Sequence, residues 1–178
     1  MKNIFDEIDQ LQSEINLFKP FTKESLDLLK NYYKIGLTYS SNALEGNSLT
    51  ESETKVVLEE GLTIGGKPLK DHFEALGHAE AYDLLYKLAK NKSISEEEIK
   101  KLHHLFYCRI DETHAGKYRT LPVLLTGSKY PLPSPKDIPQ LMHQLIPDID
   151  QMRTTKHPVE TAALVHKEFV FIHPFMDI

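Results

Sequence analysis

The stretch HPVETAALVHKEFVFIHPFMDI, residues 157–178, decides how the C-terminal part of the chain folds. Its apolar residues recur at three- and four-residue steps, which predicts a helix over residues 158–172. Pro174 follows His173 directly, and the residue before a proline is disfavoured in the helical conformation. We therefore expect His173 to end this helix, where its side chain can face a cleft. The residues on the shared apolar face are Ala162, Val165, Phe169 and Ile172.

Polar residues that directly follow a buried segment are candidates for a functional site. The spacing of His173 and Asp177 can place a general base close to a metal ligand. Phe175 lies between them and can fold back as an apolar anchor, which would leave Asp177 in an exposed loop. His166 shares about the same helix face as His173, but this pair lacks a third ligand at a recognisable metal-binding spacing. A histidine that serves only the structure is the alternative interpretation of His173.

Helical periodicity also dominates the chain before this stretch. Thr50 with Glu53, and Ser95 with Glu98, form capping boxes, a pattern typical of helix starts. Pro147 is expected to bend or shorten the helix in which it falls. The predicted helical segments are residues 4–19, 23–44, 51–60, 71–90, 96–106 and 138–149.

The segment GKYRTLPVLLTGSKYPLPSPKD, residues 116–137, breaks the helical pattern, because it is rich in β-formers, glycine and proline. VLLT, then Gly127-Ser128, then KYPL predicts a short hairpin with the glycine at its turn. Exposed backbone groups along such a hairpin could pair with an extended peptide, or the hairpin could simply pack on the helices. The predicted fold is thus one all-α domain over residues 1–178 that carries a β-hairpin.

Composition narrows the class of protein. The chain has 178 residues, 40% of them apolar and 26% charged, with a net charge of −5, which together indicate a soluble globular domain. The acidic balance argues against a broad nucleic-acid interface, because phosphate binding needs clustered Lys and Arg. Cys108 is the only cysteine, and no stretch resembles a signal peptide or a membrane span. We therefore expect a cytoplasmic protein without a membrane segment.

The sequence FVFIHPFMD resembles the start of the Fic-domain signature, His-x-Phe-x-(Asp/Glu)-Gly-Asn-Gly-Arg, with His173, Phe175 and Asp177 at the matching positions. The stretch SSNALEGNSLT, residues 40–50, is similar to the family's inhibitory helix pattern, (Ser/Thr)-x-x-x-Glu-(Gly/Asn). That pattern maps onto Ser41, Glu45 and Gly46, in an inhibitory region over residues 23–46. Residues 117–132 resemble the family's flap, whose target-docking positions would be Leu124, Leu125, Thr126 and Gly127.

The resemblance implies an adenylyltransferase that moves AMP from ATP to a Ser, Thr or Tyr hydroxyl of a target protein, with Mg²⁺ as cofactor. His173 would be the general base, Asp177 the metal ligand and Phe175 a buried anchor. The flap would hold the target segment in an extended conformation. Glu45 would inhibit the resting enzyme by preventing a productive γ-phosphate pose. Homo-oligomers are compatible with this interpretation.

The chain departs from the signature after Asp177, where Ile178 replaces the first glycine and is the last residue of the sequence. Without Gly-Asn-Gly-Arg and the C-terminal helices that follow it in the family, we expect a chain of only these residues to be inactive. Three alternatives stay open at this point. The protein could remove AMP, it could transfer another phosphate-containing group, or it could be a truncated, non-catalytic module that binds and regulates a partner.

Overall fold

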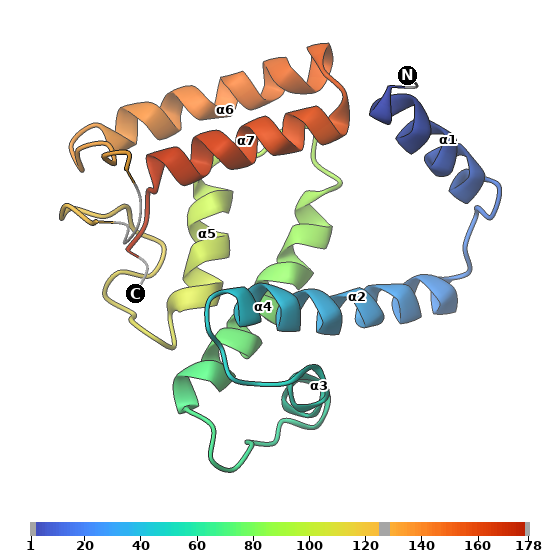
Figure 1. Ribbon diagram of the computed structural model, residues 1–178, viewed down its shortest axis with the longest axis horizontal. Coiled ribbons are helices and arrows are strands. Elements are labelled where there is room, and N and C mark those ends of the chain that lie inside the picture. The colour runs from blue at the N-terminus through green and yellow to red at the C-terminus, as the bar shows by residue number, and fades with distance from the viewer. Residues whose placement is uncertain (1–2, 125–128, 177–178) are drawn as a thin grey trace.

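A computed structural model of the chain describes residues 3–124 and 129–176. Its described residues form α-helices and no strand, which confirms the predicted all-α class (Figure 1). Helices α6 and α7 run side by side, and α5 connects them to the layer formed by α2, α3 and α4. The helices are α1 (Ile4–Asn16), α2 (Lys23–Leu44), α3 (Glu51–Glu60), α4 (Leu69–Leu88), α5 (Glu96–Tyr107), α6 (Ile138–Thr155) and α7 (Pro158–Ile172).

Both capping boxes open helices as predicted. The Thr50 hydroxyl accepts a hydrogen bond from the backbone N–H of Glu53 at 3.2 Å, and the Glu53 carboxylate accepts one from the N–H of Thr50 at 2.8 Å. Ser95 and Glu98 repeat this exchange at 3.2 and 2.7 Å. These reciprocal bonds satisfy N–H groups that have no partner inside the helix, so α3 and α5 begin at defined residues.

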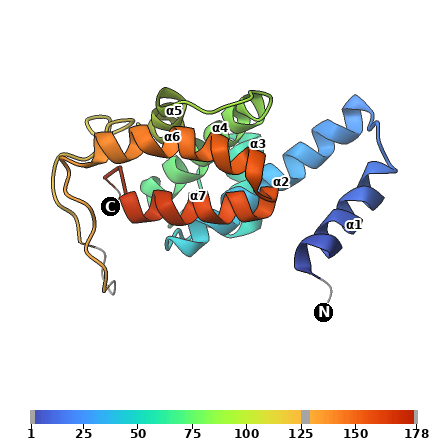
Figure 2. The same cartoon turned by 90° about the horizontal axis from the view of Figure 1, so that it is seen from above.

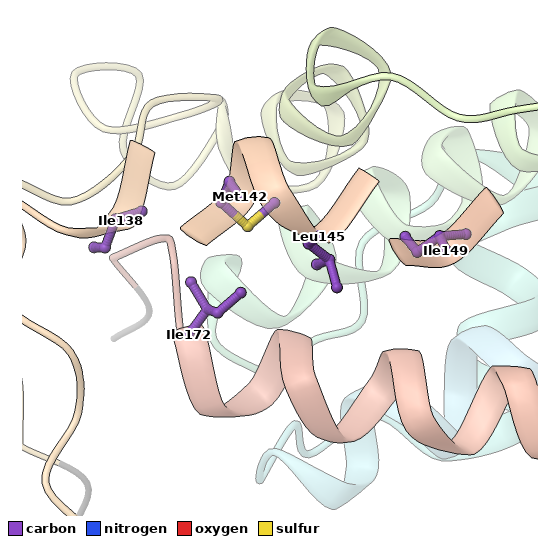
Figure 3. Packing of buried hydrophobic residues seen from close by; sticks show 5 residues of the cluster. All are labelled: Ile138, Met142, Leu145, Ile149 and Ile172. Carbon is purple, nitrogen blue, oxygen red and sulfur yellow. The ribbon is translucent and has the colours of Figure 1, made fainter. Parts of the chain in front are cut away.

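The larger hydrophobic core lies between α6 and α7 (Figure 3). Apolar residues on one face of α6 point toward α7, and Ile172 near the end of α7 meets them. Burial of these side chains fixes α7 against α6 and so determines the position of the C-terminal end of α7 in the molecule. The buried members of this cluster are Ile138, Met142, Leu145, Ile149 and Ile172.

A second core cluster joins α3 and α4 through Leu49, Val57 and Ala75. Helices α4 and α5 approach each other closely at Gly77, which is buried. A side chain at this position would collide with the backbone of Phe106 in α5. Close approach of α4 and α5 therefore connects the second cluster to the helix that packs near the end of α7.

Helix α1 stands apart from both clusters in the two views (Figures 1 and 2). It reaches the body of the molecule at the start of α7, where the ring of Phe5 stacks on His157 with centroids 4.5 Å apart. The carboxylate of Asp9 also lies 3.2 Å from Nε2 of His157. Apart from these contacts, several apolar residues of α1 remain exposed, including Leu11 and Ile15.

Pro147 does not shorten α6, which continues to Thr155. Proline has no backbone N–H, so the carbonyl four residues before Pro147 lacks its usual helical donor. Because Pro147 is exposed, water can bind this carbonyl instead. The expected hairpin stays a prediction, because residues 125–128 at its turn lie outside the described residues and the described residues on either side contain no strand.

No helix within the described ranges has both the length and the apolar character that crossing a membrane requires.

Candidate active site

The end of α7 presents His173 in an unusual backbone conformation. His173 caps the helix with φ 46° and ψ 64°, and its backbone N–H donates to the carbonyl of Phe169 at 2.9 Å. Residues other than glycine rarely adopt this left-handed conformation. Pro174 then prevents the helix from continuing. The chain therefore turns sharply at the residue that the sequence singles out as a base.

Phe175 holds this turn against the body of the molecule. Its side chain is only 5% exposed, and its ring stacks on His103 of α5 with centroids 4.0 Å apart and an interplanar angle of 3°. Tyr118 and Phe169 contribute tilted ring contacts at 5.6 and 6.3 Å. Phe175 is therefore packed by aromatic rings from three segments of the chain, which restricts the position of the turn that precedes it.

His103 is a neutral hydrogen-bond acceptor in this arrangement. Its Nδ1 accepts a hydrogen bond from the backbone N–H of Gly116 at 2.9 Å. Burial is the main cause that lowers the pKa of His103 to about 4, and the neighbouring His104 lowers it further. Sequence patterns gave no indication of His103, because its partners Gly116 and Phe175 are distant in the chain.

We expect acid to destabilise the protein through His103. The histidine pKa is about 6.5 in an unfolded chain, and it is about 4 in the folded protein. The unfolded state therefore binds the proton more readily, and the free energy of unfolding decreases as pH falls from about 6.5 to 4, by at most roughly 3 kcal/mol. Urea unfolding at several pH values in this window measures the slope.

The matched control for this prediction is His103→Asn. The asparagine side chain keeps an acceptor near the N–H of Gly116 but does not titrate. We expect the pH dependence of stability between about 4 and 6.5 to become shallower in this variant, whatever its stability at neutral pH. Equal slopes in the two proteins would show that His103 does not contribute to the acid sensitivity.

A mostly apolar groove of about 900 Å³ lies beside this turn, between α4, α5, α6 and α7. His173 lines it, and so do His103 and His166. The two histidines that share a face of α7 in the sequence therefore do face a common groove. No cluster of three or more His, Cys, Asp or Glu side chains in the described part of the chain could hold a metal ion. Asp177, the predicted metal ligand, lies outside the described residues.

The predicted inhibitory residues lie at the C-terminal end of α2. Ser41 falls in its last turns, Glu45 caps it, and Gly46 follows with φ 90°, a conformation that glycine adopts without strain. The carboxylate of Glu45 is exposed and has no hydrogen-bond or ion-pair partner among residues 3–124 and 129–176. Glu45 does not line the groove that His173 lines.

The turn after Glu45 is fastened to the start of α4. Ser48 donates to the Asp71 carboxylate from its backbone N–H at 2.7 Å and from its hydroxyl at 2.6 Å. The amide of Asn47 donates to the Asp71 carbonyl at 3.0 Å and to the Glu74 carboxylate at 2.8 Å. These bonds fix the end of α2, although periodicity and capping patterns gave no indication of them.

The predicted target-docking positions are described only in part. The side chain of Leu124 is 96% exposed. Leu125, Thr126 and Gly127 lie outside the described residues, so their role stays a prediction. Nearby, Tyr130 and Leu132 line a second cavity together with Val170 and Phe171 of α7, which places the described end of the flap segment beside α7.

Comparison with known proteins assigns the family. Residues 93–178 match the Fic/DOC family, and this range contains α5, α6, α7 and the turn at His173. The chain belongs to the Fic family. A Fic domain containing signaling protein from Bacteroides thetaiotaomicron has the same fold, with a TM-score of 0.86 and 31% identity over 96% of this chain and 66% of that one. Fic-1 from Caenorhabditis elegans gives a TM-score of 0.85 at 26% identity, covering 98% of this chain and 52% of that one.

Curated Fic relatives carry names that state an activity. Protein adenylyltransferase Fic from Nematostella vectensis is 34% identical over 146 residues, which are 78% of this chain and 33% of the relative. Protein adenylyltransferase fic-1 from C. elegans is 29% identical over 174 residues, 96% of this chain and 34% of the relative. The chain thus spans about a third of the length of these relatives.

Proposed function

We propose that this Fic protein is an adenylyltransferase that moves AMP from ATP to a Ser, Thr or Tyr hydroxyl of a target protein. The observation that supports this most directly is His173, presented by a left-handed turn at the end of α7 inside the segment that matches the family. Relatives that match this chain are named protein adenylyltransferases. Because the chain spans a third of their length, we propose the activity for the full-length protein.

In the proposed reaction, a ring nitrogen of His173 accepts the proton of the target hydroxyl as its oxygen attacks the α-phosphorus of ATP. A bond forms between that oxygen and the α-phosphorus, and the bond from the α-phosphorus to the β-phosphate oxygen breaks. Pyrophosphate leaves and AMP stays on the target. Fixing the turn that carries His173 favours this step, because the base must meet the hydroxyl in a narrow range of geometries.

We also propose the remaining roles that the signature implies. Asp177 is proposed as a ligand of Mg²⁺, since carboxylate oxygens are ligands that this ion prefers. Residues Leu124 to Gly127 are proposed to pair with an extended target segment by strand addition. The cytoplasm, where ATP is available and where Cys108 would stay reduced, is the proposed location.

Self-inhibition by Glu45 is part of the proposal. Its carboxylate is exposed at the end of α2, and the backbone that follows it is held by the bonds of Asn47 and Ser48 to α4. An exposed carboxylate without a partner in the described part of the chain is suited to interact with the cationic groups of a phosphate site. Ser41, one turn earlier on the same face of the helix, and Gly46, which ends it, complete the inhibitory pattern.

We expect Glu45→Gly in the full-length protein to increase AMP transfer roughly 5- to 150-fold, the range that corresponds to a coupling free energy of about 1–3 kcal/mol. ATP labelled at the α-phosphate measures transfer to protein, and ATP labelled at the γ-phosphate is the control for phosphorylation. Since Glu45 is exposed, the substitution should leave the fold intact.

Glu60→Gly is the matched control, because Glu60 is also an exposed acid at a helix end. Its rate should equal that of the wild-type protein. If Glu45→Gly and the wild type both leave no α-label on protein, the proposed activity is wrong. If other nucleotides serve as donors and ATP does not, the transferred group must be reassigned.

A further inference from the structure

Arg119 is a buried cation whose role neither the signature nor the helical pattern predicts. Only 2% of its surface is exposed, and no carboxylate pairs with it among the described residues. Burial lowers the pKa of its guanidinium. A buried charge without an opposite charge is costly unless hydrogen bonds compensate it. The groups that accept hydrogen bonds from Arg119 therefore indicate what this residue does.

Every hydrogen bond that Arg119 donates to the described residues goes to a backbone carbonyl. Two reach the turn after α7: its backbone N–H donates to Pro174 at 2.8 Å, and its Nε–H donates to His173 at 2.7 Å. Of the other two, Nη1 donates to Leu121 in the flap segment at 3.2 Å, and Nη2 donates at 2.8 Å to Pro133, the residue that directly follows the segment. Arg119, which itself lies in the flap segment (residues 117–132), thus connects the turn that carries His173 to the first part of this segment and to the residue that directly follows it.

The hydrogen bonds from Arg119 help to stabilise the left-handed conformation of His173. A non-glycine residue in that region is strained and keeps this conformation only where the surroundings over-determine it. The bonds from Arg119 hold the carbonyls of the strained residue and of Pro174 after it. Lysine could keep the charge, but its single ammonium lacks the planar fork that reaches separate acceptors in fixed directions.

We propose that Arg119 is a positioning residue for AMP transfer. It holds His173, the first part of the flap segment and Pro133 directly after that segment in one rigid frame, so that the base and the docked hydroxyl keep a constant relative position. This inference rests on the proposed function, because it assigns the flap segment to target docking and His173 to proton removal. A misplacement of about 1 Å between reacting groups lowers the rate roughly 10²-fold.

The test compares Arg119→Lys with a variant of similar stability in the full-length protein that also carries Glu45→Gly. Val57→Ala is that control, because it creates a cavity in the cluster between α3 and α4 and touches neither the turn nor the flap segment. For Arg119→Lys we expect kcat to fall about 10²-fold. KM for ATP should stay within about twofold, because the side chain of Arg119 is committed to protein carbonyls. For Val57→Ala we expect both constants to stay near those of the parent.

Hydrogen–deuterium exchange provides a readout that does not depend on activity. In Arg119→Lys, peptides over residues 119–124 and 169–176 should exchange faster together, while peptides from α3 stay unchanged. In Val57→Ala, peptides from α3 should exchange faster, while peptides over residues 119–124 and 169–176 stay unchanged. Unchanged exchange at residues 169–176 in Arg119→Lys, or a loss of kcat no larger than that of Val57→Ala, overturns the inference. If the parent protein shows no AMP transfer, the proposed function fails, and exchange alone decides whether Arg119 couples the two segments.

Discussion

His173→Asn in the full-length protein is expected to lose AMP transfer by a factor of roughly 10² to 10⁴, the usual contribution of a general base. Asparagine is the informative substitution, because it tolerates the left-handed backbone that His173 adopts better than alanine does. It cannot accept a proton at neutral pH, so it removes the chemistry and keeps the turn. Transfer from α-labelled ATP, measured in the Glu45→Gly background, gives the rate.

The control for this prediction is His143→Asn on α6, because this histidine side chain is 89% exposed and meets only the Glu96 carboxylate, at 3.4 Å, among the described ion pairs. We expect its transfer rate to equal that of the parent protein. Circular dichroism should show that both variants melt at similar temperatures. If His173→Asn retained more than about a tenth of the parent rate, His173 would not be the base that the signature implies.

Gly77→Ala is expected to have the largest effect on stability. A Cβ at this position would overlap the carbonyl oxygen of Phe106, and would lie 2.8 Å from its Cα and 2.9 Å from the Leu105 oxygen. These are backbone atoms, so only separation of α4 from α5 could relieve the overlap. Overpacking of this kind typically costs about 1–3 kcal/mol. For a chain of this length we expect a fall in Tm of roughly 2–4 °C for each kcal/mol.

Gly36→Ala on α2 separates this effect from helix propensity. A Cβ there would meet only Oε1 of Glu51 at 3.8 Å, an ordinary contact. Alanine is favoured over glycine in a helix by up to about 1 kcal/mol, so this variant should be as stable as the wild type or more stable. Equal denaturation midpoints for the two variants would contradict the close packing of α4 on α5.

The helices could be predicted because the information that defines them is local. The capping boxes at Thr50 and Ser95 lie within four residues of their partners, and both start a helix where expected. Pro174 similarly places the end of α7 at His173. Apolar periodicity gave α2 its observed limits, although it missed the first residues of α4. Pro147 was expected to bend or shorten its helix, and of these two outcomes shortening is wrong, because α6 continues to Thr155. The exposure of Pro147, which lets the freed carbonyl be hydrated, could not be known from the sequence.

The residues that hold the candidate site in place, Arg119 and His103, could not be predicted, because their partners are distant in the sequence. Arg119 bonds to Pro133 and His173, which are 14 and 54 positions away. His103 meets Phe175 only after α5 has packed beside the end of α7. The single arginine of the turn-rich residues 116–137 was the one available signal, since an arginine needs several acceptors when it is buried.

The acceptors of Arg119 also determine how freely the flap segment can change during evolution. Every amino acid supplies a backbone carbonyl, so substitutions at Leu121 or in the segment that follows leave the acceptor available for Arg119. Side chains that would contact a target can therefore diverge without disturbing the support of His173. Under the docking role proposed for the flap, this chain could accommodate a different target there while the position of His173 stays unchanged.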